Sequence, residues 1–198
     1  MLVHLRRSLV MAVFCLVFFG FVYAFAGTGV AQLFFKSQAD GSITANGSTL
    51  IGQNWTSPKY FHGRPDDAGP YAADAKKDIS GGDNPLVANG VSGESAATNL
   101  GPRSQVLLAD TKELVAYWHK MGVNPTPDLV TTSGSGYDPD ISQQVALVHI
   151  PMVSKARGIA PSVLRTLIVK ATHPAELGFL GASYIDVLQL NEALAALK

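Results

Sequence analysis

The chain has 198 residues, of which 47% are hydrophobic and 15% are charged, with 15 basic and 15 acidic side chains. This length leaves room for one soluble domain beside a long apolar segment. The balanced charge excludes the broad basic surface of a nucleic-acid-binding protein, and the single cysteine excludes an internal disulfide.

The first predicted element is a membrane-spanning helix. Ser8 to Phe35 is a run of 28 residues without Asp, Glu, Lys, Arg or His, and about 20 apolar helical residues cross a bilayer. A water-soluble helix of this length needs a polar face, which the segment up to Ala26 does not offer. We therefore assign residues 1–35 to a cytoplasmic stub and a transmembrane anchor. Cys15 lies inside this anchor.

Two arginines predict the orientation of the anchor. Arg6 and Arg7 lie at its short N-terminal end and should stay in the cytoplasm, because basic residues near a membrane helix resist translocation. Residues 36–198 then face outward. They carry 13 basic residues against 15 acidic ones, a formal charge of −2, so we expect no nucleic-acid partner for this part.

The rival interpretation of the same segment is a cleavable signal peptide. Ala24-Phe25-Ala26 has the small-x-small form that signal peptidases accept. Against cleavage, the apolar run is longer than a signal core of about 7–15 residues, and Val30 to Phe35 continue it beyond the cut. Both interpretations export the domain and differ only in whether the anchor is retained.

Turn residues mark the start of the exported part. Two short strand-like runs, Ser42–Ala45 and Ser48–Gly52, flank Asn46-Gly47, the dipeptide typical of a type I′ turn. We therefore expect a β-hairpin there. The following segment, Tyr60–Pro102, is rich in Pro and Gly and is typical of a long loop.

Helical spacing of apolar residues predicts four helices after this loop. They run from about Val106 to Gly122, from Ser142 to Arg157, from Pro161 to Thr172, and from Asp186 toward the end of the chain. Pro151 should kink or divide the second helix, and Leu129–Ser133 is typical of a short buried strand. The predicted fold class is mixed α/β: one N-terminal transmembrane helix, then a single exported α+β domain.

The sequence offers no complete catalytic motif. It contains neither a Walker-type phosphate loop nor the Asp-Lys-Thr-Gly-Thr motif that P-type ATPases phosphorylate. Gly134-Ser135-Gly136 could suggest a hydrolase nucleophile, but Ser133 stands where Gly-x-Ser-x-Gly requires its first glycine. The histidines show no metal-ligand spacing. We therefore predict no catalytic residue, no metal site and no bound cofactor.

Eight strings carry a resemblance to a known family. They are GSTLIGQNW (47–55), YFHGRP (60–65), SGGDN (80–84), NLGP (99–102), DLVTTSGSGYDPDIS (128–142), SKARG (154–158), LGFLG (177–181) and DVLQLNEAL (186–194). In this order, behind one apolar N-terminal helix, they resemble the KdpC family, the C subunits of Kdp potassium-transporting P-type ATPases. The resemblance covers essentially the whole chain.

The resemblance implies a bacterial or archaeal inner-membrane complex that imports potassium at the expense of ATP. The implied partners are a KdpA-like ion-conducting subunit, a KdpB-like catalytic subunit, a small KdpF-like peptide and membrane lipid. It implies a non-catalytic subunit that assembles and stabilises the complex, or one that helps the catalytic subunit to bind nucleotide. Arg6 and Arg7 favour the first role, because they place the domain outside, away from cytoplasmic ATP. ATP is then expected only at the level of the complex. An unrelated exported binding or hydrolytic domain is a third hypothesis.

Two departures from the family pattern limit what the resemblance transfers. His149-Ile150-Pro151-Met152 stands where members usually read Gln-x-x-Arg, so no ligand role of that Gln or Arg is carried over. Asp140 holds a place often taken by His or Asn.

Two glycine-rich loops are candidate partner contacts, because loops carry recognition more often than regular elements do. The alternative is that their glycines only permit turns. Small residues in the apolar helix offer close packing in the membrane. The candidate contacts are Ser80, Gly81, Gly82, Asp83, Asn84, Ser133, Gly134, Ser135, Gly136, Tyr137 and Asp138, and the candidate packing residues are Gly20, Ala24 and Gly27.

Overall fold

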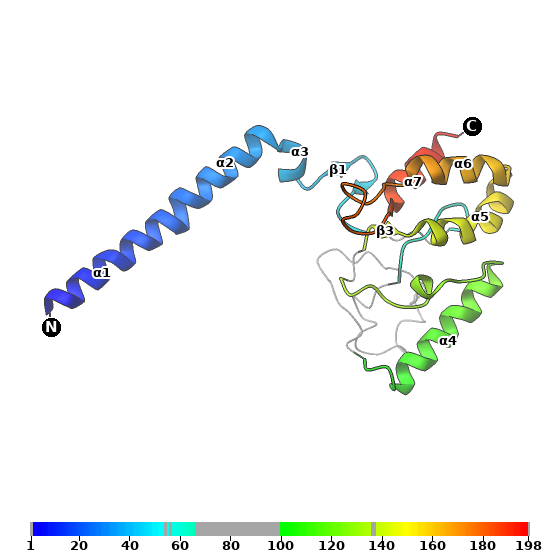
Figure 1. Cartoon of the computed structure of the whole chain (residues 1–198), viewed down its shortest axis with the longest axis horizontal. Coiled ribbons are helices and arrows are strands. Elements are labelled where there is room, and N and C mark those ends of the chain that lie inside the picture. The colour runs from blue at the N-terminus through cyan, green and yellow to red at the C-terminus, as the bar shows by residue number, and fades with distance from the viewer. Residues whose placement is uncertain (1, 54, 56, 66–99, 136–137, 198) are drawn as a thin grey trace. The chain divides into compact units, whose positions relative to one another are not determined.

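The structure is a computed structural model that describes residues 2–53, 55, 57–65, 100–135 and 138–197 (Figure 1). The candidate loop Ser80–Asn84, and Gly136 and Tyr137 of the second loop, lie outside these described residues. The chain divides into two compact units, residues 1–45 and residues 46–198.

The first unit is dominated by one long apolar helix. Its segments are α1 (Leu2–Val17), the π-helical η1 (Phe18–Tyr23) and α2 (Ala24–Phe34), which together run for 33 residues. At 1.5 Å per residue the helix is about 50 Å long, more than the ~30 Å hydrocarbon layer requires. None of its residues is buried. These properties confirm the prediction of one N-terminal helix long and apolar enough to span a membrane.

A short helix and a hairpin follow. α3 (Lys36–Ala39) precedes β1 (Ile43–Thr44), which pairs with β2 (Gly47–Ser48) in a two-stranded sheet. The hairpin is confirmed, but its turn lies at residues 45–46 rather than at Asn46-Gly47. Gly47 opens β2 instead, and a Cβ at this position would lie 2.8 Å from Nε2 of Gln53.

The second unit is mostly helical. Its elements are α4 (Gln105–Lys120), the 3₁₀ turn η4 (Pro127–Leu129), β3 (Asp140–Ile141), α5 (Gln143–Arg157), α6 (Pro161–Ala171), β4 (Ile185–Asp186) and α7 (Val187–Ala195). β3 and β4 pair antiparallel, with Asp140 opposite Asp186 and Ile141 opposite Ile185. The structure therefore agrees only loosely with the predicted mixed α/β class, since every strand that it describes has two residues.

The predicted strand at Leu129–Ser133 is wrong. Pro127 fixes the backbone angle that opens a helical turn, and the chain forms η4 at this point. The carbonyl oxygen of Leu129 accepts a hydrogen bond from Nε1 of Trp118 at 3.0 Å. A side chain on α4 thus takes the place of a neighbouring strand.

The predicted helices are confirmed with their caps. The side chain of Ser142 accepts a hydrogen bond from the backbone N–H of Val145, and Gly158 ends α5 in the left-handed conformation at φ +69°. Asp186 caps α7 in the same way as Ser142 caps α5. Pro151 does not divide α5, which runs through it. α5 packs against α6, and tertiary packing can outweigh the one helix hydrogen bond that a proline removes.

The core of the second unit lies between α4, α5, α6 and α7 (Figure 1). Each helix contributes a buried apolar stripe. The fully buried members include Trp118, Leu129, Val145, Val153, Leu164, Ile168, Leu190 and Leu194.

An extended segment is clamped onto this core by one polar side chain. The buried Asn191 on α7 accepts a hydrogen bond from the backbone N–H of Phe61 at 2.9 Å and donates one from Nδ2 to the carbonyl of Phe61 at 2.8 Å. The amide thereby reproduces the pairing that a neighbouring strand would supply. This clamp places the following residues, His62 and Arg64, where the next contacts form.

Candidate interaction site

The described part of the loop Ser133–Asp138 is pinned to the domain. The hydroxyl of Ser133 donates to Oδ2 of Asp138 at 3.3 Å and lies 3.1 Å from the hydroxyl of Ser135. The backbone N–H of Ser133 donates to the carbonyl of Pro65 at 2.9 Å. Ser133 is buried, whereas Gly134 and Ser135 are exposed, so only part of this loop can meet a partner directly.

Arg64 is the residue that sequence reasoning missed. Its Nη1 lies 3.2 Å from Oδ2 of Asp138, and its Nη2 donates to the carbonyl of Thr132 at 3.4 Å. Both charged side chains are about one quarter exposed, so solvent screening limits the pair to about 1 kcal/mol. The signal that could have found it is the string Tyr60–Pro65, which carries the resemblance but includes no predicted site residue.

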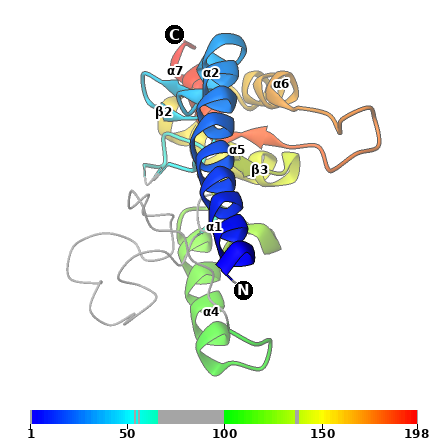
Figure 2. The ribbon, with the colours of Figure 1, turned by 90° about the vertical axis from the view of Figure 1, so that its left-hand side faces the viewer.

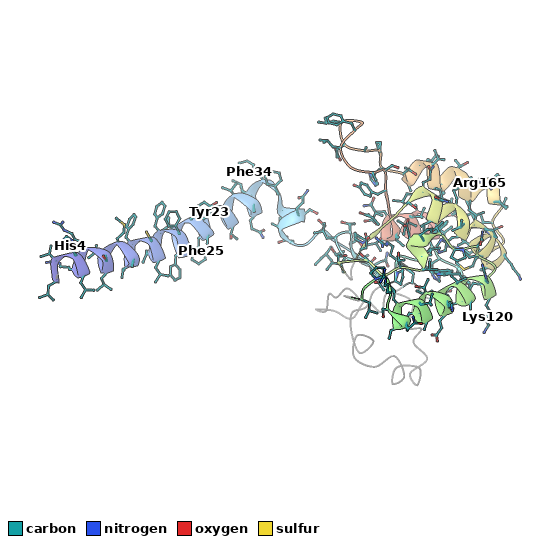
Figure 3. All side chains as sticks on the ribbon, turned by 60° about the horizontal axis from the view of Figure 1, so that its bottom comes forward. His4, Tyr23, Phe25, Phe34, Lys120 and Arg165 are labelled. Atoms are coloured by element: carbon teal, nitrogen blue, oxygen red, sulfur yellow. The ribbon has the colours of Figure 1, made fainter. Side chains whose placement is uncertain are left out.

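The three small residues of the apolar helix are exposed along it. Gly20 lies in η1, Ala24 opens α2, and Gly27 follows one turn later. A Cβ at Gly27 would meet nothing within 4 Å, and one at Gly20 would meet only a side-chain atom of Leu16 at 3.9 Å. Substitution at either position therefore tests packing against another molecule rather than packing within the helix. Figure 3 shows Tyr23, Phe25 and Phe34 projecting outward from the same helix.

Two histidines that are far apart in the sequence meet in the core. His62 and His149 are both fully buried, and their ring centroids lie 5.7 Å apart. Trp118 packs against both, at 5.3 Å from His62 and 5.1 Å from His149. We call His62, Trp118 and His149, with Phe61 beside His149 at 6.2 Å, the histidine cluster.

In each of these two histidines, one ring nitrogen forms a hydrogen bond with a backbone carbonyl. His62 Nε2 lies 3.0 Å from the oxygen of Ser57, and His149 Nδ1 lies 2.7 Å from the oxygen of Val145. A carbonyl only accepts, so these nitrogens carry the protons. Burial lowers the pKa of His62, and burial together with the neighbouring His62 lowers the pKa of His149 to about 3. Both rings are therefore neutral at pH 7.

Acidic side chains face each other across the β3–β4 pair. Burial, and then the charges of Asp138 and Asp186, raise the pKa of Asp140 to about 6. Burial also raises the pKa of Asp186, against the hydrogen bond from the backbone of Gln189. The described residues include no group of three or more His, Cys, Asp or Glu side chains that could hold a metal ion.

A long apolar helix joined to a small, mostly helical domain is consistent with a single-pass membrane-anchored protein. A family model described as "KdpC: K+-transporting ATPase, c chain" matches residues 5–196.

Curated relatives cover the chain from end to end. A potassium-transporting ATPase KdpC subunit of Methylobacterium nodulans is 39% identical over 204 residues, which span 98% of this chain and 97% of the relative. Proteins of the same description from Gemmatimonas aurantiaca and Rhodopseudomonas palustris are each 40% identical, over 100% and 99% of this chain and 95% and 98% of the relatives. The chain therefore belongs to the KdpC family and is a subunit of a potassium-transporting P-type ATPase complex.

Proposed function

We propose that this chain is a non-catalytic accessory subunit of an ATP-driven potassium uptake pump. It assembles and stabilises the complex between a KdpA-like ion-conducting subunit and a KdpB-like catalytic subunit, with a small KdpF-like peptide beside them. Residues 1–35 anchor it in the plasma membrane with the N-terminus in the cytoplasm. Residues 36–198 form the domain outside.

The observation that carries this proposal is the match to C subunits over nearly the full length of the chain, together with the one membrane-length helix found among the described residues. Arg6 and Arg7 at the N-terminal end of the helix support the orientation. The loops Ser80–Asn84 and Ser133–Asp138 are the proposed partner contacts outside the membrane, and Gly20, Ala24 and Gly27 the proposed packing surface within it. The ion pair between Arg64 and Asp138 supports this assignment, because it holds a described end of the second loop in place before binding.

The test uses cells that depend on this ATPase for growth in low potassium. Removing the chain should abolish growth and prevent recovery of the remaining subunits as one complex from detergent extracts. If the complex forms at normal yield and only the KM of its ATPase activity for ATP rises, the chain is a nucleotide-binding helper instead. If both are unchanged, the accessory role is wrong.

Orientation is tested separately with a reporter at the C-terminus. Alkaline phosphatase fused after Lys198 folds only outside the cytoplasm and should be active. A green fluorescent protein at the same position, exported unfolded, should be dark. The reverse pattern would contradict the proposed orientation.

A further inference from the structure

A narrow projection leaves the second unit between α6 and β4. Residues 173–184, which we call the tongue, run outward and return as a pair of antiparallel bridges, His173 with Tyr184 and Glu176 with Leu180. Four backbone hydrogen bonds of 2.8–3.0 Å close these bridges. Figure 2 shows the tongue extending away from the helices of its unit as the orange segment between α6 and β4.

The tip of the tongue is apolar and uncovered. Leu177 is 81% exposed, Phe179 is 74% exposed and Leu180 is 51% exposed. From Leu177 to Tyr184 the sequence has no charged residue. Single exposed apolar residues are common on soluble proteins, but a contiguous group at a projecting tip marks an interaction site.

The tip is also held in one shape. Leu177 has φ +53°, a conformation rarely adopted by residues other than glycine, and Gly178 and Gly181 follow at φ +80° and +79°. The N–H of Gly178 donates to the carbonyl of Ala175 at 3.0 Å. At the base, the rings of His173 and Tyr184 stack with centroids 4.9 Å apart. A tip fixed in this way loses little conformational entropy on binding.

We propose that the tongue inserts Leu177, Phe179 and Leu180 into an apolar pocket on the aqueous face of another protein subunit of the same ATPase. This inference rests on the proposed accessory role. It adds a contact surface that includes none of the loop residues proposed above.

Charge and shape favour a protein, rather than the lipid surface, as the binding partner of the tongue. From Ala171 to Tyr184 there is no Lys or Arg, and Glu176 places a carboxylate beside the tip. Membrane-surface segments commonly use basic residues to reach anionic lipid, and a carboxylate is repelled there. Fluid lipid also requires no defined shape, whereas a protein pocket does. A buried aromatic anchor such as Phe179 is the commonest kind of binding hot spot.

The first test is photocrosslinking from the tip in intact membranes. A photoreactive phenylalanine analogue at Phe179 should crosslink to one polytopic subunit of the ATPase, identified by mass spectrometry. The matched control is the same analogue at Val169, an apolar α6 residue that is 62% exposed; it should not reach that subunit. Crosslinking at Phe179 to lipid alone, to a second copy of this chain, or to nothing would overturn the proposal.

The second test measures co-purification of the full chain with the other subunits. Phe179→Asp should reduce their recovery at least tenfold while Val169→Asp leaves it unchanged, and tryptophan fluorescence should report a folded domain in both. Undiminished recovery with Phe179→Asp refutes the tongue contact alone. Failure of the wild-type chain to recover any ATPase subunit refutes the accessory role itself.

Discussion

Replacing His149 with glutamine should make the domain less sensitive to acid. In the folded chain the pKa of His149 is lowered to about 3, whereas an unfolded chain has a histidine pKa of about 6.5. Below pH 6.5 this histidine therefore binds a proton in the unfolded state but not in the folded state, so stability falls as the pH falls. The contribution of the neutral His149 ring to the free energy of unfolding is fully present above pH 6.5 and is lost as the pH falls from that value to about 3.

The magnitude follows from these two pKa values. Between pH 7 and pH 5 the neutral, buried ring of His149 should cost the wild-type domain about 2 kcal/mol of unfolding free energy. His62 adds a loss of the same sign, because burial lowers its pKa as well. Glutamine at position 149 does not titrate, so the variant should lose about 2 kcal/mol less over this range.

Urea unfolding of the full chain in detergent, followed by tryptophan fluorescence at pH 7 and pH 5, measures this difference. Trp118 lies 5.1 Å from His149, and both tryptophans belong to the second unit. Comparing the pH dependence rather than stability at one pH cancels the fixed cost of the substitution. His119→Gln, at an exposed position on α4, is the matched control. Equal pH dependence in wild type and His149→Gln would refute the reasoning.

Four further outcomes are expected. Asp140→Asn should raise stability at pH 7 by about 1 kcal/mol after allowance for solvent screening. The pKa of Asp140 is raised to about 6, so the stability of the wild-type domain falls as the pH rises from about 4 to 6. Thermal unfolding at pH 4 and pH 7 checks that the gain appears only at pH 7. Asn191→Ala should lower the free energy of unfolding by about 3 kcal/mol, since it leaves the N–H and carbonyl of Phe61 buried without their partner. A loss below 1 kcal/mol in urea unfolding would show that Asn191 does not hold this segment. Gly158→Ala should cost about 1 kcal/mol through its left-handed backbone alone, because a Cβ there meets nothing within 4 Å; an unchanged midpoint of urea unfolding argues against this. Mass spectrometry of the mature chain should find the anchor retained, and an N-terminus at Gly27 would support the signal-peptide interpretation.

Local signals predicted the elements well. The N-terminal helix followed from an uninterrupted apolar run, and α5 from a serine cap, a helical stripe and a terminal glycine. Each of these signals lies inside the element it specifies or directly beside it. The strand expected at Leu129–Ser133 failed because a tertiary contact decided that segment: the indole of Trp118 holds the carbonyl of Leu129.

The arrangement around the candidate site depends on contacts between distant residues. Arg64 meets Asp138 across 74 positions, and Asn191 meets Phe61 across 130. Neither pair has a spacing rule that a single sequence reveals. The same holds for His62 and His149, which have no metal-ligand spacing and yet share one buried cluster. The string LGFLG carries part of the resemblance, but only the structure shows that Leu177, Phe179 and Leu180 are exposed.

The π-helical segment Phe18–Tyr23 changes how the membrane helix should be mapped by mutation. A π segment acts as one additional residue within an α-helix, and one residue turns the helix by about 100°. Residues that share one side of the helix in Leu2–Val17 are therefore not continued on the same side by the regular helical spacing in Ala24–Phe34. A scan of single substitutions along this helix should give two periodic patterns that are out of phase, with the break within Phe18–Tyr23. A partner helix that follows one side of the first half faces different residues in the second, so the two halves can serve two neighbours.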